Sequence, residues 1–199
     1  AVGSHDGTVY VVDIARGGVK KVGRSAQGEV TGLTFSPCGR YLVWRDAIRF
    51  EGACGRLVGY DLTEGSSFVL TRGQFNDYCP VFSLDGKYLY FLSSRTIDPS
   101  YDEIGFDLGF TNTVRPYVIP LRAEDPVPFG PTADGWAISD DKDDKAETQE
   151  DESKPDPIVF DLAGAEDRMA PLPVPAGRYD GLMATASGVA WRHLAPSTG

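Results

Sequence analysis

The chain has 199 residues, 41% of them hydrophobic and 24% charged, which is typical of a soluble globular protein with a sizeable core. Its net charge of −10 leaves no basic face for nucleic acid, and no apolar run approaches the ~20 residues that cross a bilayer. The three cysteines have no disulfide or metal-ligand spacing, and no signal peptide is visible. We therefore expect reduced thiols and a cytoplasmic protein. Because the chain begins at Ala1 without Met, we also expect a piece of a longer polypeptide.

The first predicted elements are short strands joined by glycine turns. Residues 8–14 (TVYVVDI) are β-branched and aromatic, and Gly17-Gly18 turns the chain into a second strand at 19–22. Residues 33–36 and 41–44 then flank a Ser-x-x-Gly turn, which predicts a hairpin because Gly39 tolerates a positive φ. A third strand follows at residues 57–61, and its phrase LVGYDL matches VYVVDI at an offset of 48.

A repeat organises the chain. Residues 34–44 (TFSPCGRYLVW) recur as residues 81–91 (VFSLDGKYLYF) at a constant offset of 47, with Phe, Ser, Gly, Tyr and Leu identical. A repeat of this length built from hairpins indicates β-propeller blades. The predicted fold is therefore all-β: a β-propeller fragment of about four blades, made of four-stranded antiparallel sheets with a period of about 47 residues.

The second copy of the repeat predicts strands at residues 80–83, 88–92 and 117–120, and further strands are predicted at 158–161 and 189–193. Nine acidic residues stand against three lysines in residues 139–156, so we expect disorder there. The predicted division is a partial blade at 1–28, a blade at 29–74, a blade with an insertion (95–114) at 75–132, an acidic disordered insert at 133–156, and partial blades at 157–199. We expect residues 126–131 (PVPFGP) to end the third of these blades.

The insertion at residues 95–114 alternates acidic with apolar side chains, which favours an ordered excursion packed on the propeller. Its carboxylates could bind a cation, but their spacing does not fit an EF-hand loop, and we favour a packing role. We take this insertion as a candidate gating loop, with the candidate residues Arg95, Asp98, Tyr101, Asp102, Phe106 and Asp107.

No catalytic constellation stands out. His5 and His193 are the only histidines, and neither has a Gly-x-Ser-x-Gly elbow or another nucleophile context nearby. Gly17-Gly18 and Gly52–Gly55 fit no phosphate-binding fingerprint. We therefore expect no catalytic residue, no cofactor and no metal ion in this chain.

Several phrases resemble one known family. The turns at 36–39 and 83–86 are similar to the Ser-Pro-Asp-Gly repeats of TolB-type and tricorn-type propellers, with Cys38 in place of the usual Asp and Leu84 in place of Pro. More specific phrases resemble the second, seven-bladed type of propeller of tricorn proteases, in bacterial homologues of actinomycete type: residues 91–103 (FLSSRTIDPSYDE), 106–110 (FDLGF), 115–117 (RPY), 126–131 (PVPFGP), 160–168 (FDLAGAEDR) and 173–179 (PVPAGRY).

This resemblance implies a large cytoplasmic serine peptidase, a homohexamer in which two propellers precede a PDZ-like domain and a catalytic domain. The catalytic residues of the family lie in those other domains, so this segment itself is expected to be inactive. It would gate or channel peptide substrates to the catalytic domain, with the remaining domains and peptides as partners and neither nucleic acid nor membrane among them. The alternative is a stand-alone propeller module that binds a protein or peptide.

Overall fold

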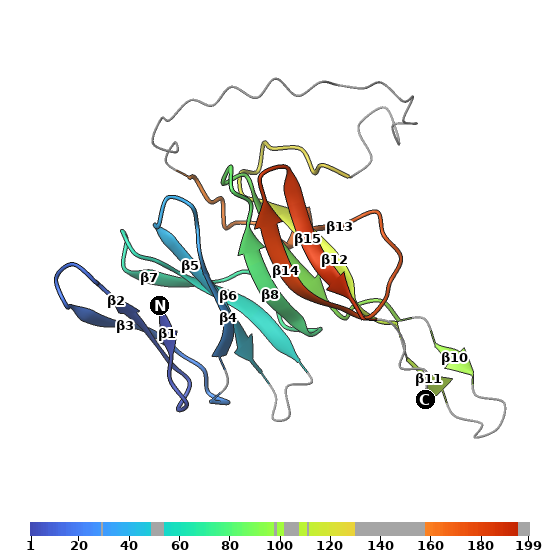
Figure 1. Ribbon diagram of the computed structural model, residues 1–199, viewed down its shortest axis with the longest axis horizontal. Helices are drawn as coiled ribbons and strands as arrows, with labels where there is room; N and C mark the ends of the chain where they lie inside the picture. The colour runs from blue at the N-terminus through green and yellow to red at the C-terminus, as the bar shows by residue number, and fades with distance from the viewer. Residues whose placement is uncertain are drawn as a thin grey trace.

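A computed structural model describes residues 1–28, 30–48, 54–97, 99–101, 108–110, 112–129 and 158–194. Within these ranges the fold is all-β, with a single 3-10 turn, η2 (Glu166–Arg168). Four antiparallel sheets stand side by side, and we call them blades 1 to 4 in chain order (Figure 1). The predicted fold class is confirmed. The acidic stretch 133–156 lies outside the described residues.

Blade 1 contains β1 (Val2–Gly3), β2 (Thr8–Val12) and β3 (Val19–Arg24). Blade 2 contains β4 (Val30–Phe35), β5 (Tyr41–Ala47), β6 (Gly55–Asp61) and β7 (Ser66–Val69). Blade 3 contains β8 (Asp77–Phe82), β9 (Tyr88–Ser93), β12 (Arg115–Pro120) and β13 (Ala170–Pro171). Blade 4 contains β14 (Tyr179–Thr185) and β15 (Gly188–His193), which form a hairpin.

One predicted strand is wrong. Residues 158–161 form no strand, and blade 3 does not end at residues 126–131, because its fourth strand is β13, beyond residue 158. Ile158 and Phe160 instead insert their side chains between blades 2 and 3, where both are buried. Residues 158–171 therefore return to complete blade 3 rather than opening another blade. The alternating pattern that predicted a strand was produced by a segment that packs one face against a core.

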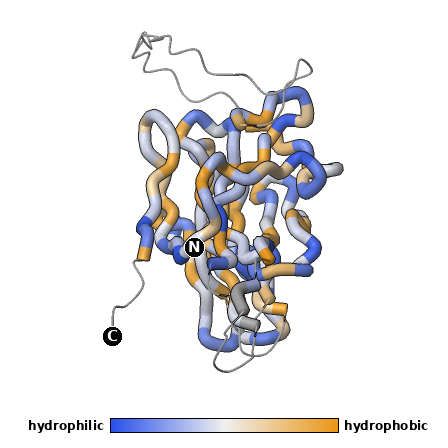
Figure 2. The backbone as a smooth tube through the Cα atoms, turned by 90° about the vertical axis from the view of Figure 1, so that its right-hand side faces the viewer, coloured by the Kyte–Doolittle hydropathy of each residue, from blue (hydrophilic) through white to orange (hydrophobic). Residues whose placement is uncertain are grey.

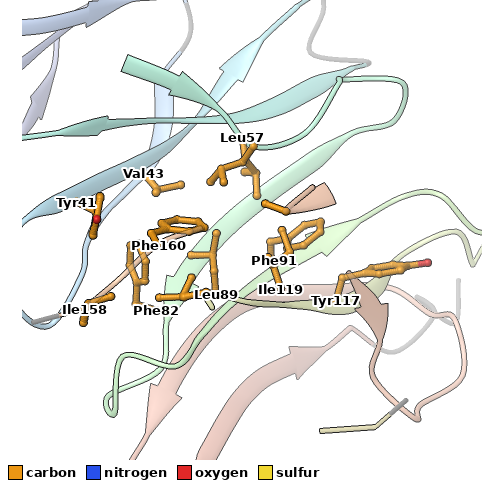
Figure 3. Close-up of a cluster of buried hydrophobic side chains, with 13 residues drawn as sticks. Tyr41, Val43, Leu57, Phe82, Leu89, Phe91, Tyr117, Ile119, Ile158 and Phe160 are labelled. Atoms are coloured by element: carbon orange, nitrogen blue, oxygen red, sulfur yellow. The ribbon is translucent and has the colours of Figure 1, made fainter. Parts of the chain in front are cut away.

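Alternate side chains of each inner strand face opposite neighbouring blades. In β5, Tyr41 and Val43 join the core between blades 2 and 3 (Figure 3), whereas Leu42 and Trp44 join the core between blades 1 and 2. In the tube coloured by hydropathy, polar segments gather at the turns and apolar segments lie along the strands (Figure 2). Because both faces of a blade are covered, inner strands such as β5 and β9 are buried along nearly their whole length.

The first strand of blades 2, 3 and 4 carries the same irregularity. The ladder of each first hairpin shifts register between Thr31 and Thr34, between Tyr78 and Val81, and between Asp180 and Met183. A residue with positive φ opens each shift: Gly32 (67°), Cys79 (50°) and Gly181 (66°). Cys79 is the one non-glycine residue with a positive φ in the described part of the chain. The blades thus share a β-bulge as well as their strand order.

Candidate functional site

The insertion of blade 3 forms a small hairpin at the end of the blades opposite the Ser-x-x-Gly turns. β10 (Ser100–Tyr101) pairs with β11 (Leu108–Gly109), and the Thr96 N–H donates to the Thr113 carbonyl oxygen at 3.2 Å. The hairpin projects away from the blades (Figure 1). Ile97 and Phe110, at its two ends, are 72% and 52% exposed. At these two positions the prediction that the insertion packs its apolar side chains on the propeller is wrong.

The candidate gating residues have different outcomes. Tyr101 is placed in β10, while Asp98, Asp102, Phe106 and Asp107 lie outside the described residues. Arg95 lies at the root of the insertion, and only 14% of its side chain is exposed. Its side-chain contacts lie within the described part of the chain.

Arg95 is held between blades by charge and by aromatic rings. Its guanidinium donates to Asp77 Oδ1 at 2.8 Å and to Ser93 Oγ at 2.8 Å. It also lies over three rings, at 5.0 Å from the ring centres of Phe75 and Tyr117 and 5.8 Å from that of Phe91. A guanidinium with these partners is not free to contact a passing substrate. Arg95 therefore anchors the base of the hairpin to the blade, and its direct gating role is not supported.

The blades converge at their first strands. The edge strands β4, β8 and β14 contact one another in sequence, whereas the outermost strands of neighbouring blades diverge. The contact is close at the bulges: a Cβ atom on Gly32 would lie 2.9 Å from Cδ of Pro80. One edge of each first strand therefore points toward a common axis, as in a propeller channel.

Burial and nearby anions shift the pKa of two groups beside this axis. Burial and the neighbouring Cys79 and Asp180 raise the pKa of Tyr78 to about 12, and the Tyr78 hydroxyl donates to the carbonyl oxygen of Tyr179 at 3.3 Å. Burial also raises the pKa of the Cys79 thiol. A thiol held in its protonated form is a poor nucleophile.

No catalytic or metal-binding cluster emerges from the residues that are described. Their His, Cys, Asp and Glu side chains form no group of three or more that could hold a metal ion. The same residues include no helix long and apolar enough to span a membrane.

A concave pocket between blades 3 and 4 was missed by the sequence reasoning. Arg178, Tyr179 and His193 line it together with Asn112, and its volume is about 640 Å³. In the sequence His193 stands out only as one of two histidines, with neither a nucleophile context nor a metal-ligand spacing. Aligning the three first hairpins would have placed it opposite Tyr179, but nothing in the sequence indicates that the space between them is open.

Four side-by-side antiparallel sheets, repeated bulges and converging first strands define part of a β-propeller. The chain belongs to the family of the tricorn protease second beta propeller domain, which matches residues 1–199. It is 42% identical over 204 residues to tricorn protease homolog 1 of Streptomyces coelicolor, covering all of this chain and 18% of that protein. Tricorn protease of Thermoplasma acidophilum is 30% identical over 124 residues, which are 60% of this chain and 12% of that protein.

The fold agrees with a solved structure. The crystal structure of the tricorn protease superposes with a TM-score of 0.70 and 24% identity, covering 89% of this chain and 16% of that chain. The chain therefore spans less than a fifth of the length of these relatives.

Proposed function

We propose that this chain is a non-catalytic wall segment of a tricorn-like serine peptidase, and that it channels extended peptides toward a catalytic domain elsewhere in the protein. The observation that carries the proposal is the convergence of β4, β8 and β14 at one axis. A strand edge offers backbone N–H and C=O groups, which an extended peptide can use and a folded protein cannot. The family match supports the peptidase context.

The β10–β11 hairpin is the part of this wall that we assign to gating. It projects beyond the blades (Figure 1), and Arg95 holds its root through the buried carboxylate of Asp77. As part of the same proposal, the parent protein is cytoplasmic and homo-oligomeric. The free state of Cys38, Cys54 and Cys79 is consistent with a reducing compartment.

The proposal is tested by shortening the hairpin in the complete peptidase. Residues 97–112 are replaced by a tight turn between Thr96 and Thr113, whose backbone hydrogen bond already closes the loop. We expect turnover of long peptides to change more than turnover of short chromogenic peptides. An equal change for both lengths would show that the hairpin only packs. The matched control replaces the exposed turn of blade 1 between Asp13 and Gly18, which should leave both rates unchanged.

The non-catalytic part has a separate test. The isolated chain should hydrolyse no peptide or ester above background, because the described residues contain no positioned nucleophile with a base and an oxyanion site. Turnover that survives purification and is blocked by a serine-directed inhibitor would refute this part of the proposal.

A further inference from the structure

The crevices between neighbouring blades share one geometry. The first hairpin of each complete or partial blade ends in an equivalent cross-strand pair: Val30 with Asp46, Asp77 with Ser93, and Tyr179 with His193. Two positions before the second member of each pair stands an aromatic residue that faces the preceding blade: Trp44, Phe91 and Trp191. The three crevices can therefore be compared position by position.

In the first two crevices an arginine meets a carboxylate of the chain. Arg56 bonds Asp46 at 3.0 Å between blades 1 and 2. Arg95 bonds Asp77 at 2.8 Å between blades 2 and 3. Asp46 and Asp77 are only 7% and 1% exposed, and a charge buried to this extent requires a partner. In both crevices the charge of the arginine is therefore neutralised by a carboxylate of the same chain.

The third crevice has no carboxylate at either of these two positions, because His193 stands where blade 2 has Asp46. Tyr179 stands where blade 3 has Asp77, and its hydroxyl is already bonded to the Pro175 carbonyl oxygen at 2.8 Å. None of the described residues lining the pocket is acidic, and the nearby Asp180 is paired with Arg192 at 2.6 Å. Within the described part of the chain, the side chains of Arg178 and His193 make no hydrogen bond or ion pair.

We propose that this pocket between blades 3 and 4 binds the terminal carboxylate of a peptide. Arg178, His193 and the amide of Asn112 supply hydrogen-bond donors for the two oxygens. The Tyr179 ring, which packs at 5.2 Å from the ring centre of His193, supplies an apolar wall for the last side chain of the peptide. In the two sister crevices a carboxylate of the chain itself pairs with the arginine: Asp46, at the position of His193, and Asp77, at the position of Tyr179. The site goes beyond the proposed channel role, and its binding can be measured whether or not that role holds.

The location agrees with a peptide as ligand. Tyr179 begins β14, one of the strands that converge on the axis, and Asn112 belongs to the foot of the insertion hairpin. On a chain with a net charge of −10, a pocket lined by basic and neutral groups is a local exception that attracts an anion.

The test uses the full 199-residue chain and the imidazole NMR signals of its two histidines. The probe is an acetylated Ala-Leu dipeptide with a free carboxylate, compared with the same dipeptide as its amide and with inorganic phosphate. We expect the acid to shift the His193 signal in a saturable way and the amide to leave it in place, while His5, in the loop between β1 and β2, serves as an internal reference.

Arg178→Gln should lower the affinity of the pocket for the dipeptide with a free carboxylate about tenfold, since it removes one charge-assisted contact. The matched control is Arg192→Gln, on the same hairpin but outside the pocket lining, which should change the affinity less than twofold. The proposal is overturned if the amide binds as well as the acid, if His193 does not respond, or if both variants behave alike. A response to phosphate as strong as that to the dipeptide would overturn the peptide in favour of a general anion site.

Discussion

Blades 2 and 3 are two copies of one sheet built from very different lengths of chain. Blade 2 uses one continuous stretch from Val30 to Val69, whereas blade 3 begins at Asp77 and ends at Pro171. Both nevertheless have the same strand order, and Tyr41 opposite Asp61 corresponds to Tyr88 opposite Pro120. The register and the two buried faces therefore define a blade, and the connections between its strands are free to grow.

The two blades also differ in the carboxylate that caps the turn after their third strand. In blade 2, Asp61 ends the third strand, accepts the N–H groups of Thr63 and Glu64, and bonds Arg40 at 2.7 Å. The Arg40 guanidinium holds the pKa of Asp61 below its usual value. Blade 3 has Pro120 at this position, and Asp161 from the returning segment accepts the Ala123 N–H at 2.8 Å. A carboxylate from a distant part of the sequence serves the same turn.

The largest expected effect tests the packing that joins these two blades. Phe160 lies edge-on to Tyr41, Phe68 and Phe82, at 5.7, 5.7 and 6.5 Å between ring centres. Phe160→Ala should lower the free energy of unfolding by about 4 kcal/mol, because it leaves a cavity between the blades. Urea unfolding measures the change. Phe129→Ala, at a residue that is 40% exposed, is the control and should cost less than about 0.5 kcal/mol.

The next effect concerns the root of the blade 3 insertion. Arg95→Ala should lower the free energy of unfolding by about 3 kcal/mol, because it leaves the Asp77 carboxylate buried without its charged partner. The comparison is Arg192→Ala, whose ion pair with Asp180 is 70% and 43% exposed and should contribute less than about 1 kcal/mol. Equal costs in urea unfolding would contradict the assignment of Arg95 as an anchor.

A pair of substitutions sharpens the comparison of the two turns. Asp61→Ala should cost about 2 kcal/mol, since it removes two backbone contacts and a partly exposed ion pair. Asp161→Ala should cost about 1 kcal/mol, since its side chain accepts the Ala123 N–H alone among the described contacts. Because the pKa of Asp61 is lowered by folding, its stabilisation is present above the unfolded value near 4 and is lost as the pH falls below it. The stability difference between the Asp61 variant and the unsubstituted chain should therefore shrink in acid.

A further effect is confined to alkaline pH. The pKa of Tyr78 is about 12 in the folded chain and about 10 in an unfolded one, so folding favours its protonated form. The stabilisation is complete below pH 10 and is lost as the pH rises through 12. Tyr78→Phe should therefore lose less stability than the unsubstituted chain between these pH values, as measured by urea unfolding at each pH. A steeper loss in the variant would show that Tyr78 is not the group concerned.

The fold was largely predictable because its signals are local. The repeat of Tyr41 as Tyr88, the turn glycines Gly39 and Gly86, and alternating apolar strands determine hairpins that need no distant partner to be recognised. Residues 158–161 were misassigned because a segment that packs one face between blades has the same alternation as a strand. The two differ in whether the backbone has a ladder partner, and that depends on long-range topology.

The site was less predictable for a related reason. Arg95 has polar sequence neighbours that are typical of a loop, but its partners Phe75, Asp77 and Tyr117 come from the loop before β8, from β8 and from β12. Arg178 and His193 carry no motif, and they become notable only beside sister crevices that contain a carboxylate. The difference between the third crevice and the other two is seen only when the blades are superposed, and neither residue indicates it from the sequence.

The late arrival of β13 has a consequence for the order in which the chain folds. Residues 62–65 connect β6 to β7, but residues 121–169 separate β12 from β13 within a single sheet. Closing the longer loop costs about 2 kcal/mol more chain entropy, which must be lost before the contacts of β13 are gained. Contacts between residues distant in sequence slow folding. Blade 2 should thus form early from local strand pairing, with its Tyr41 side chain available to pack against blade 3. The pairing of β13 with β12 should follow as a slower kinetic phase of folding.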